Sequence, residues 1–515
     1  MALFNVSNGR AQFDAAGNEP GDVYGAGVRL TQSGATRVTT TAGTDFNGGI
    51  PMSSTGQVSV VDATAGLPAD TIYLNGLPIS NNAVCVSRNA AAVVSNGLPF
   101  DSAGAVAGDI NLDLNFVGAT SLNSSVTFTR ASTATYFDST GTLQSAAIDA
   151  PRFDFNPSTL AAQGLLIEES RTNSIRNNTM QGAVAGTPGT LPTNWNVSGL
   201  GTLTQQVVGT GTVNGINYVD IRLSGTTSTT QVAIRFDFNN VIAAANGQTW
   251  AFSWWQSVVA GSTANLTPQA PSMLFYDAGA GFLGGIGFTA ATFNSTSNFT
   301  RQSGSATIAT ANTAFIQPQI NFLFASGAAI DITLRIGLPQ LEQGAFATSV
   351  IPTTTTALTR AADVASVNTL SPWYNASAST IYAEVAVPQL GRAARPWTVD
   401  DGSMSNIVDA TISVANGFAV EAIAGGVYGG FAAATGLITA NTTQKTAAVF
   451  TTSGNELACL NAGTVGSNAI TLPSVSLTRL LLGRQDNGVA LCGWLRRLTY
   501  YPRAFSAAEL QAITS

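Results

Sequence analysis

The sequence of 515 residues contains no histidine. Catalytic arrangements built on an imidazole are therefore excluded, and so are histidine metal sites and histidine proton shuttles. Charged residues make up only 10% of the chain, lysine occurs once, at Lys445, and the net charge is −7. Phosphate binding needs clustered cations, which this composition does not supply, so we expect no nucleic-acid partner.

Cysteine is scarce as well. Cys85, Cys459 and Cys492 lie far apart without a CxxC spacing. This pattern favours small buried side chains, and it leaves a bridge between Cys459 and Cys492 open. The first residues, MALFNVSNGRAQF, lack a basic region followed by an apolar run, so we expect no secretory signal.

One uncharged run, Ala422 to Ala440, is long enough to span a bilayer, although such runs occur by default in a chain with so few charges. It contains five glycines and two threonines, which favours Gly-rich strands. We therefore expect no membrane partner.

Apolar residues are abundant, at 45% of the chain, and glycine occurs 52 times. This content is enough to bury a core, which excludes wholesale disorder. The length predicts about two to four domains. We predict an all-β protein in which an N-terminal β-repeat or intertwined anchor is followed by two jelly-roll or lectin-like β-sandwiches.

Residues 1–110 contain a weak repeat, GIPM at 49–52, GLPI at 76–79 and GLPF at 97–100. Repeats of this length are typical of stacked units that are each too small to bury their own apolar face. Because proline cannot donate to a central strand ladder, we expect short strands, tight turns and sharing of the structure between subunits.

Residues 186–352 show strand patterns of alternating polar and apolar residues, as expected of a β-sandwich. The clearest strands lie at 217–223, 231–238 and 329–336. The region is similar to carbohydrate-binding jelly-roll modules at Leu191–Trp195 and at Phe275–Asp277.

Two runs carry a further resemblance. The first, Arg130 to Asn173, reads RASTATYFDSTGTLQSA and, further on, APRFDFNPSTLAAQGLLIEESRTN; the second, Pro339 to Val364, reads PQLEQGAFATSVIPTTTTALTRAADV. Both resemble segments of bacteriophage head-spike, head-fibre and tail-fibre proteins. The resemblance assigns 111–185 as the spike or fibre motif segment.

The same resemblance implies a structural protein on the virion surface, at the head or the tail. It also implies a homotrimer in which residues 1–110 attach to other virion proteins of the capsid, neck or tail.

The final part, 366–515, is similar to laminin-G or concanavalin-A-like sandwiches in its closing run Cys492–Ser506, CGWLRRLTYYPRAFS. Ser506 and Glu509 form a capping box that predicts a short helix to Ile513. We expect Trp397 and Trp494 to belong to the core of this part.

Sugar-binding sandwiches use exposed aromatic rings that stack on pyranoses, aided by polar side chains. In the strand 248–256, Trp250, Phe252 and Trp254 share one face, which we expect to be core, whereas Trp255 lies on the other. Trp255 is therefore the first carbohydrate-binding candidate, and packing against a neighbouring domain explains it equally well. Tyr276 and Tyr428, the second lying in a Gly-rich bend, complete the set.

Glycoside cleavage needs two carboxylates that face one another. The doublets Asp400–Asp401 and Glu168–Glu169 cannot supply such a pair, because adjacent residues of a strand point to opposite faces. We expect a turn at the first doublet and a strand end held by Arg171 at the second. We therefore predict no catalytic residues and a protein that is not an enzyme.

Metal binding has one weak candidate, a calcium site formed by the oxygen ligands of Asp400, Asp401 and Asn406; otherwise we expect no cofactor. The favoured function is adhesion to bacterial surface polysaccharide. Two alternatives stay open, namely a head decoration fibre that binds no glycan and a glycan-cleaving tailspike.

Overall fold

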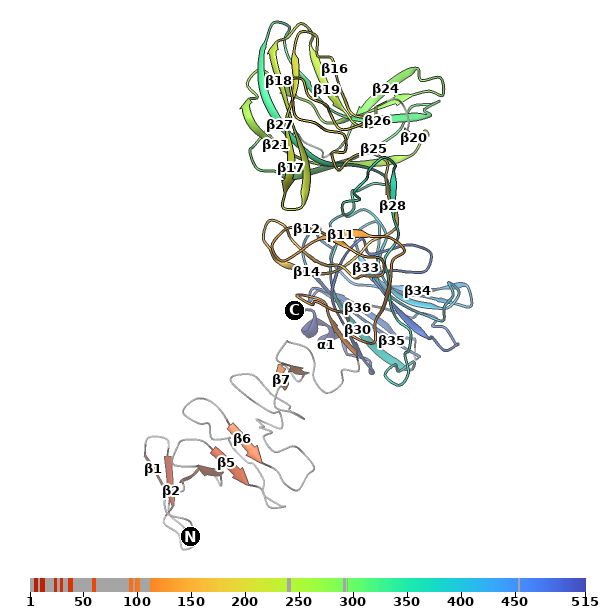
Figure 1. Ribbon diagram of the computed structural model, residues 1–515. Helices are drawn as coiled ribbons and strands as arrows, with labels where there is room; N and C mark the ends of the chain where they lie inside the picture. The colour runs from red at the N-terminus through yellow and green to blue at the C-terminus, as the bar shows by residue number, and fades with distance from the viewer. Residues whose placement is uncertain are drawn as a thin grey trace.

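The protein is described here by a computed structural model. The structure describes residues 112–515, apart from 239–241, 290–292, 294 and 453, and the backbone of eight strands among the first 111 residues. The regular secondary structure of the described residues consists of β-strands and a single short helix, which confirms the predicted all-β class. They form two β-sandwiches, the upper and the middle body in Figure 1.

The amino-terminal strands form one sheet and one hairpin. Antiparallel pairing joins the sheet strands except the last two, which are parallel. The sheet contains β1 (Phe4–Ser7), β2 (Arg10–Phe13), β3 (Val23–Gly25), β4 (Val28–Leu30), β5 (Thr36–Thr39) and β6 (Val58–Val61), and the hairpin contains β7 (Ala92–Ser95) and β8 (Leu98–Asp101). The first two copies of the predicted repeat, 49–52 and 76–79, lie outside the described residues, and the third overlaps β8.

The upper sandwich packs a 7-stranded sheet on a 5-stranded sheet. The first sheet contains β16 (Asn196–Ser198), β19 (Gln231–Arg235), β26 (Phe315–Leu323), β23 (Ser272–Tyr276) and β24 (Phe282–Gly287), with β20 (Ile242–Ala243) and β22 (Thr267–Pro268) paired to β26. The second contains β17 (Thr204–Val213), β18 (Ile216–Thr226), β27 (Ala329–Gln343), β21 (Thr249–Ser262) and β25 (Thr300–Thr307). As predicted, Trp250, Phe252 and Trp254 lie in the core between the sheets.

The carboxyl-terminal sandwich is assembled from two distant parts of the chain. Its first sheet contains β13 (Phe153–Phe155), β14 (Ala162–Ile167), β39 (Gly493–Tyr501), β30 (Ala378–Ala386), β35 (Gln444–Thr451), β36 (Glu456–Leu460) and β37 (Gly466–Asn468), with β9 (Leu112–Asn115) also paired to β39. Its second contains β10 (Thr127–Thr129), β29 (Val364–Val367), β38 (Arg479–Leu482), β31 (Ala394–Asp400), β32 (Ile407–Ile412), β33 (Phe418–Ala424) and β34 (Val427–Ala433). Strand pairing therefore crosses the boundary expected at residue 185.

The upper sandwich is consequently an insertion in the carboxyl-terminal one. The chain leaves along β15 (Arg171–Asn173) and returns along β28 (Leu358–Arg360), and these two strands pair with each other. The hairpin of β11 (Ala134–Phe137) and β12 (Leu143–Ala146) lies between the two bodies (Figure 1). This hairpin therefore occupies the junction.

Two further local predictions are confirmed. Residues 422–424 and 427–433 of the Gly-rich run 422–440 lie in the strands β33 and β34. The helix α1 (Ala507–Ile513) begins with the predicted capping box, in which Glu509 N donates to Ser506 Oγ and Ser506 N donates to Glu509 Oε2. Leu510 of this helix packs on the sheet.

Candidate functional site

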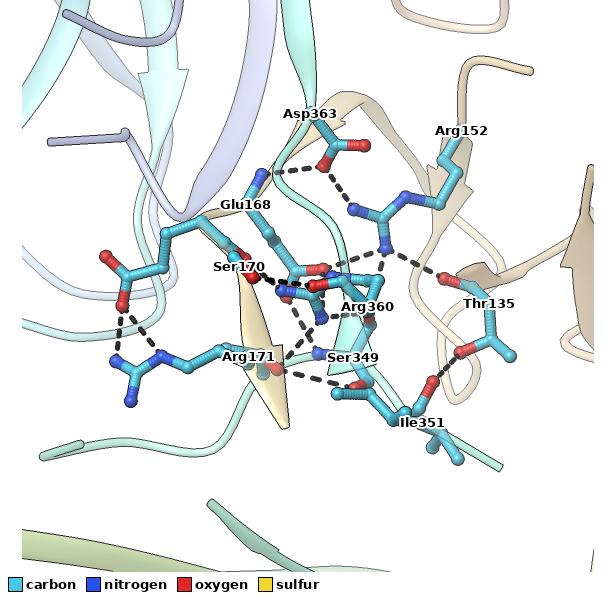
Figure 2. A network of polar contacts seen from close by, with 12 residues as sticks. Thr135, Arg152, Glu168, Ser170, Arg171, Ser349, Ile351, Arg360 and Asp363 are labelled. Carbon is cyan, nitrogen blue, oxygen red and sulfur yellow. Dashed lines mark hydrogen bonds and ion pairs between the residues drawn. The ribbon is translucent and has the colours of Figure 1, made fainter. Parts of the chain in front are cut away.

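The segments 130–173 and 339–364 meet in a buried network of charged side chains at the junction (Figure 2). Arg152 donates to Glu168 Oε2 at 2.8 Å and to Asp363 Oδ2 at 2.5 Å. Arg130 donates to Asp363 Oδ1 at 3.1 Å, and Arg360 lies 3.1 Å from Glu168 Oε2. These side chains are at most 6% exposed. The network links the segment before the insertion to the segment after it.

Glu168 is the centre of this network. Ser349 N and Ser349 Oγ both donate to its carboxylate, at 2.7 and 2.6 Å. Although burial opposes ionisation, the guanidinium groups of Arg360 and Arg152 hold the pKa of Glu168 at about 2. The expectation that Arg171 holds both glutamates is wrong for Glu168, while Glu169 Oε1 does accept from Arg171 Nε at 2.8 Å.

A cavity of about 280 Å³ opens beside the network. Its walls come from β11, β13, the returning segment 346–350 and the start of β39. Asp154 Oδ1 accepts from Phe137 N at 2.7 Å, and its Oδ2 accepts from Trp494 Nε1 at 2.8 Å. Burial raises the pKa of Asp154 to about 6. Trp494 is therefore a half-buried cavity wall, not the core residue that the sequence predicted, whereas Trp397 is core as expected.

Trp255, the first sugar-binding candidate, is only 4% exposed. The hairpin covers it, with the ring of Phe137 6.5 Å from its own, and the guanidinium of Arg301 lies over its face at 4.9 Å. Packing against the neighbouring body, the alternative left open by the sequence, therefore accounts for this ring. The role as a direct sugar contact does not fit its burial.

Tyr276 lies half-buried at the end of β23. Its hydroxyl and Gln317 Oε1 are 3.4 Å apart, and its ring contacts the edge of Phe282 at 5.8 Å. The side chain is thus partly engaged by its own sheet.

The three calcium candidates do not converge on one point. Arg479 Nε donates to Asp400 Oδ1 at 2.6 Å, and Asn406 turns its amide nitrogen, not its oxygen, toward Asp401 at 2.8 Å. Across the described part of the chain, no group of three or more Cys, Asp or Glu side chains could hold a metal ion. In the same part, Cys459 and Cys492 are free thiols.

Tyr428 is the one aromatic candidate with a largely open ring, at 56% exposure. It lies on β34, the edge strand of its sheet, together with Phe431, which is 49% exposed. Residues three apart on a regular strand point to opposite faces. Here the register shifts between Ala422 and Ile423 opposite the Gly429–Gly430 pair, so that Tyr428 and Phe431 face the same side.

Charged side chains lie beside these rings. Arg395 bridges two carboxylates, with Nε 2.9 Å from Asp409 Oδ2 and Nη2 2.7 Å from Glu421 Oε1. Burial and the charge of Glu421 raise the pKa of Tyr428. Burial raises the pKa of Asp409 well above its ordinary value, against the attraction of Arg395. We name Tyr428, Phe431, Glu421 and Arg395 the aromatic platform.

Sequence reasoning found Tyr428 and missed the other members of the platform. Phe431 was hidden because regular strand geometry places it opposite Tyr428. Arg395 and Glu421 come from β31 and β33, and only the pairing of these strands through β32 brings them together. A Gly-Gly pair inside a predicted strand is the signal that could have indicated the bulge.

No protein-family model matches the chain, and no curated protein matches it. Among solved structures, the chain is similar to the CBM40 of the Ruminococcus gnavus IT-sialidase bound to α2,3 sialyllactose, with 14% identity over 27% of this chain and 84% of that chain and a TM-score of 0.25.

It is also similar to the tandem CBM22-1–CBM22-2 domains of Paenibacillus barcinonensis Xyn10C, with 9% identity over 62% of this chain and 97% of that chain and a TM-score of 0.21. Domains LG4-5 of the mouse laminin α1 chain match with 9% identity over 63% of this chain and 94% of that chain, at a TM-score of 0.21. Similarity at TM-scores this low supports no inference about function. The function is therefore inferred from the positions of the side chains described above.

Proposed function

We propose that this protein is an adhesin that binds surface polysaccharide through the aromatic platform of its carboxyl-terminal sandwich. The observation that carries the proposal is the pair of exposed rings, Tyr428 and Phe431, on one face of an edge strand beside Glu421 and Arg395. Aromatic faces stack on the apolar side of sugar rings, and charged groups accept or donate hydrogen bonds to sugar hydroxyls. The platform offers both kinds of group.

The setting of the proposed adhesin is the surface of a bacteriophage virion. This part of the proposal rests on the resemblance of the segments 130–173 and 339–364 to head-spike and fibre proteins. Residues 1–110 would attach to capsid, neck or tail, and the chain would assemble as a homotrimer. Three copies of a weak site multiply avidity when all can reach one polysaccharide.

Binding without cleavage is the form of the proposal that the platform supports best. The platform carboxylate of Glu421 and the neighbouring carboxylate of Asp409 both pair with Arg395. The side chain of Asp409 is 1% exposed, so it cannot reach a glycosidic oxygen as a general acid must. A decoration fibre without glycan binding gives no reason for two open rings beside a polar cluster.

The test compares full-length variants for binding to purified bacterial surface polysaccharide by biolayer interferometry. We expect Tyr428→Ala to weaken binding roughly tenfold, equal to about 1.4 kcal/mol, and Tyr428→Phe to retain most of it because the ring remains. Val414→Ala serves as a control, since Val414 is another exposed apolar side chain at 67% exposure. Equal polysaccharide binding by Tyr428→Ala and wild type would refute the proposed role of the aromatic platform.

A further inference from the structure

The junction cavity holds an arginine without an ion-pair partner. Arg301 lies on β25, where Nη2 donates to Ser253 Oγ at 2.9 Å and to the carbonyl of Thr348 at 2.8 Å. Its Nε is buried without a hydrogen-bond partner, and Nη1 donates to none of the described residues. A buried guanidinium that lacks an anionic partner is costly. Burial accordingly lowers the pKa of Arg301.

The carboxylates nearest to Arg301, those of Glu342 and Glu168, favour its charge from a distance but do not hydrogen-bond to it. Glu342 accepts from Gln340 Nε2 at 2.7 Å and from Thr348 N at 2.9 Å. Glu168 is covered by Arg152, Arg360 and Ser349, as described above. Neither carboxylate occupies Nη1, so this atom of Arg301 is able to donate to a group that enters the cavity.

The other walls of the cavity suit a sugar ring. Half-buried aromatic side chains of Tyr136, Phe137 and Trp494 line it, and the amide side chains of Asn156 and Gln163 lie among them. The exposed residues Pro157 and Asn441 also belong to the lining, so the cavity reaches the surface. Its volume of about 280 Å³ lies near the lower end of small-ligand sites, which start at about 300 Å³.

We propose that the junction cavity binds one carboxylate-bearing sugar unit of the hexuronic acid class, with its carboxylate on Arg301 and its ring against the aromatic wall. Carboxylate and guanidinium form charge-assisted hydrogen bonds, which are the strong kind. Amides at the rim can bond the hydroxyls, and rings can contact the apolar face. The inference adds a second site to the proposed glycan binding, and it does not require the aromatic platform.

The test is isothermal titration calorimetry of the full-length protein with sodium glucuronate and with glucose, in which an uncharged hydroxymethyl group replaces the carboxylate. We expect saturable binding of one glucuronate per chain in the millimolar range and at least tenfold weaker binding of glucose. No saturable binding of glucuronate, or equal binding of glucose, would overturn the proposal.

Variants assign the site. We expect Arg301→Gln to weaken glucuronate binding at least tenfold and Gln163→Leu, at the half-buried rim, to weaken it without loss of the fold. Arg222→Gln is the matched control, because Arg222 pairs with Asp331 on the exposed face of the upper sandwich. Unchanged affinity in both Arg301→Gln and Gln163→Leu would contradict the assignment.

Two further experiments are needed. The first distinguishes a glycan end from a free sugar as the ligand, and the second distinguishes the cavity site from the aromatic platform. If an oligoglucuronide binds with the same affinity as the monosaccharide, the ligand is the end of a glycan. If only the monosaccharide binds, the ligand is a free acidic sugar. Both outcomes support recognition of a sugar carboxylate by Arg301. Tyr428→Ala should leave glucuronate binding unchanged. A loss of glucuronate binding in Tyr428→Ala would contradict a separate cavity site, whereas failure of the platform test alone would leave it standing.

Discussion

Substitution of Asp363 is predicted to destabilise the carboxyl-terminal sandwich strongly. Its carboxylate accepts from Arg130, from Arg152 and from Glu168 N at 3.1, 2.5 and 2.8 Å. Asp363→Ala would leave two buried guanidinium groups with one carboxylate fewer. Breaking a buried ion pair by removal of one partner costs about 3–5 kcal/mol.

The measurement is differential scanning calorimetry of the full chain. For a body of about 150–250 residues, each kcal/mol shifts Tm by about 2–4 °C, so we expect a decrease of roughly 6–20 °C. The transition of the upper sandwich, whose core is separate, should shift much less.

Asp331→Ala is the control for this prediction, because its pair with Arg222 is solvent-exposed on both sides. Exposed ion pairs contribute little to stability, so its Tm should stay close to that of wild type. If Asp363→Ala matched Asp331→Ala, the network would not hold the sandwich together, and our reasoning about the junction would be refuted.

Two further predictions concern the carboxyl-terminal sandwich. Burial raises the pKa of Glu456 in the folded protein to about 7. As pH rises from about 4.5 to 7, the unfolded chain loses the carboxyl proton of Glu456 before the folded protein does. The contribution of this group to the free energy of unfolding is therefore lost over that range. Glu456→Gln should thus gain stability relative to wild type at pH 8 but not at pH 4 in urea unfolding, and an equal difference at both pH values would contradict this. At Gly429, a Cβ would collide with the carbonyl of Thr471, so Gly429→Ala should displace β34 and weaken polysaccharide binding. Gly417→Ala, where a Cβ meets only Ser413 Oγ at 3.6 Å, should bind normally; equal binding by both variants would show that the bulge does not position the rings.

Local structure was predictable from the sequence because it depends on neighbouring residues. The alternating residues at 329–336, which predicted a strand, lie within β27. The capping box at Ser506 also formed as predicted. Each of these features is specified within about ten residues of chain.

The insertion of one sandwich into the other was not predictable in the same way. It depends on the pairing of β9 and β14 with β39, strands that more than 300 residues separate. No local sequence pattern indicates which distant strand will pair with β9 or β14. The sequence did, however, single out the segments 130–173 and 339–364, which are the two that form the junction.

The same distinction applies to the site residues: local sequence patterns indicate some of them, and only the fold reveals the others. The strand pattern placed Trp255 on the correct face, but only the fold shows that a hairpin covers that face. Tyr428 was found because its bend is rich in glycine. Arg301 was not singled out, since an unpaired guanidinium can be recognised only when its surroundings are known.

We propose that the platform binds polysaccharide without cleaving it. The most direct measurement incubates the full-length protein with purified surface polysaccharides from candidate bacterial hosts, records saturable binding, and follows polysaccharide chain length over hours. We expect saturable binding that Tyr428→Ala weakens, with the polysaccharide chain length unchanged. Shortened chains, or no binding to any polysaccharide, would contradict it.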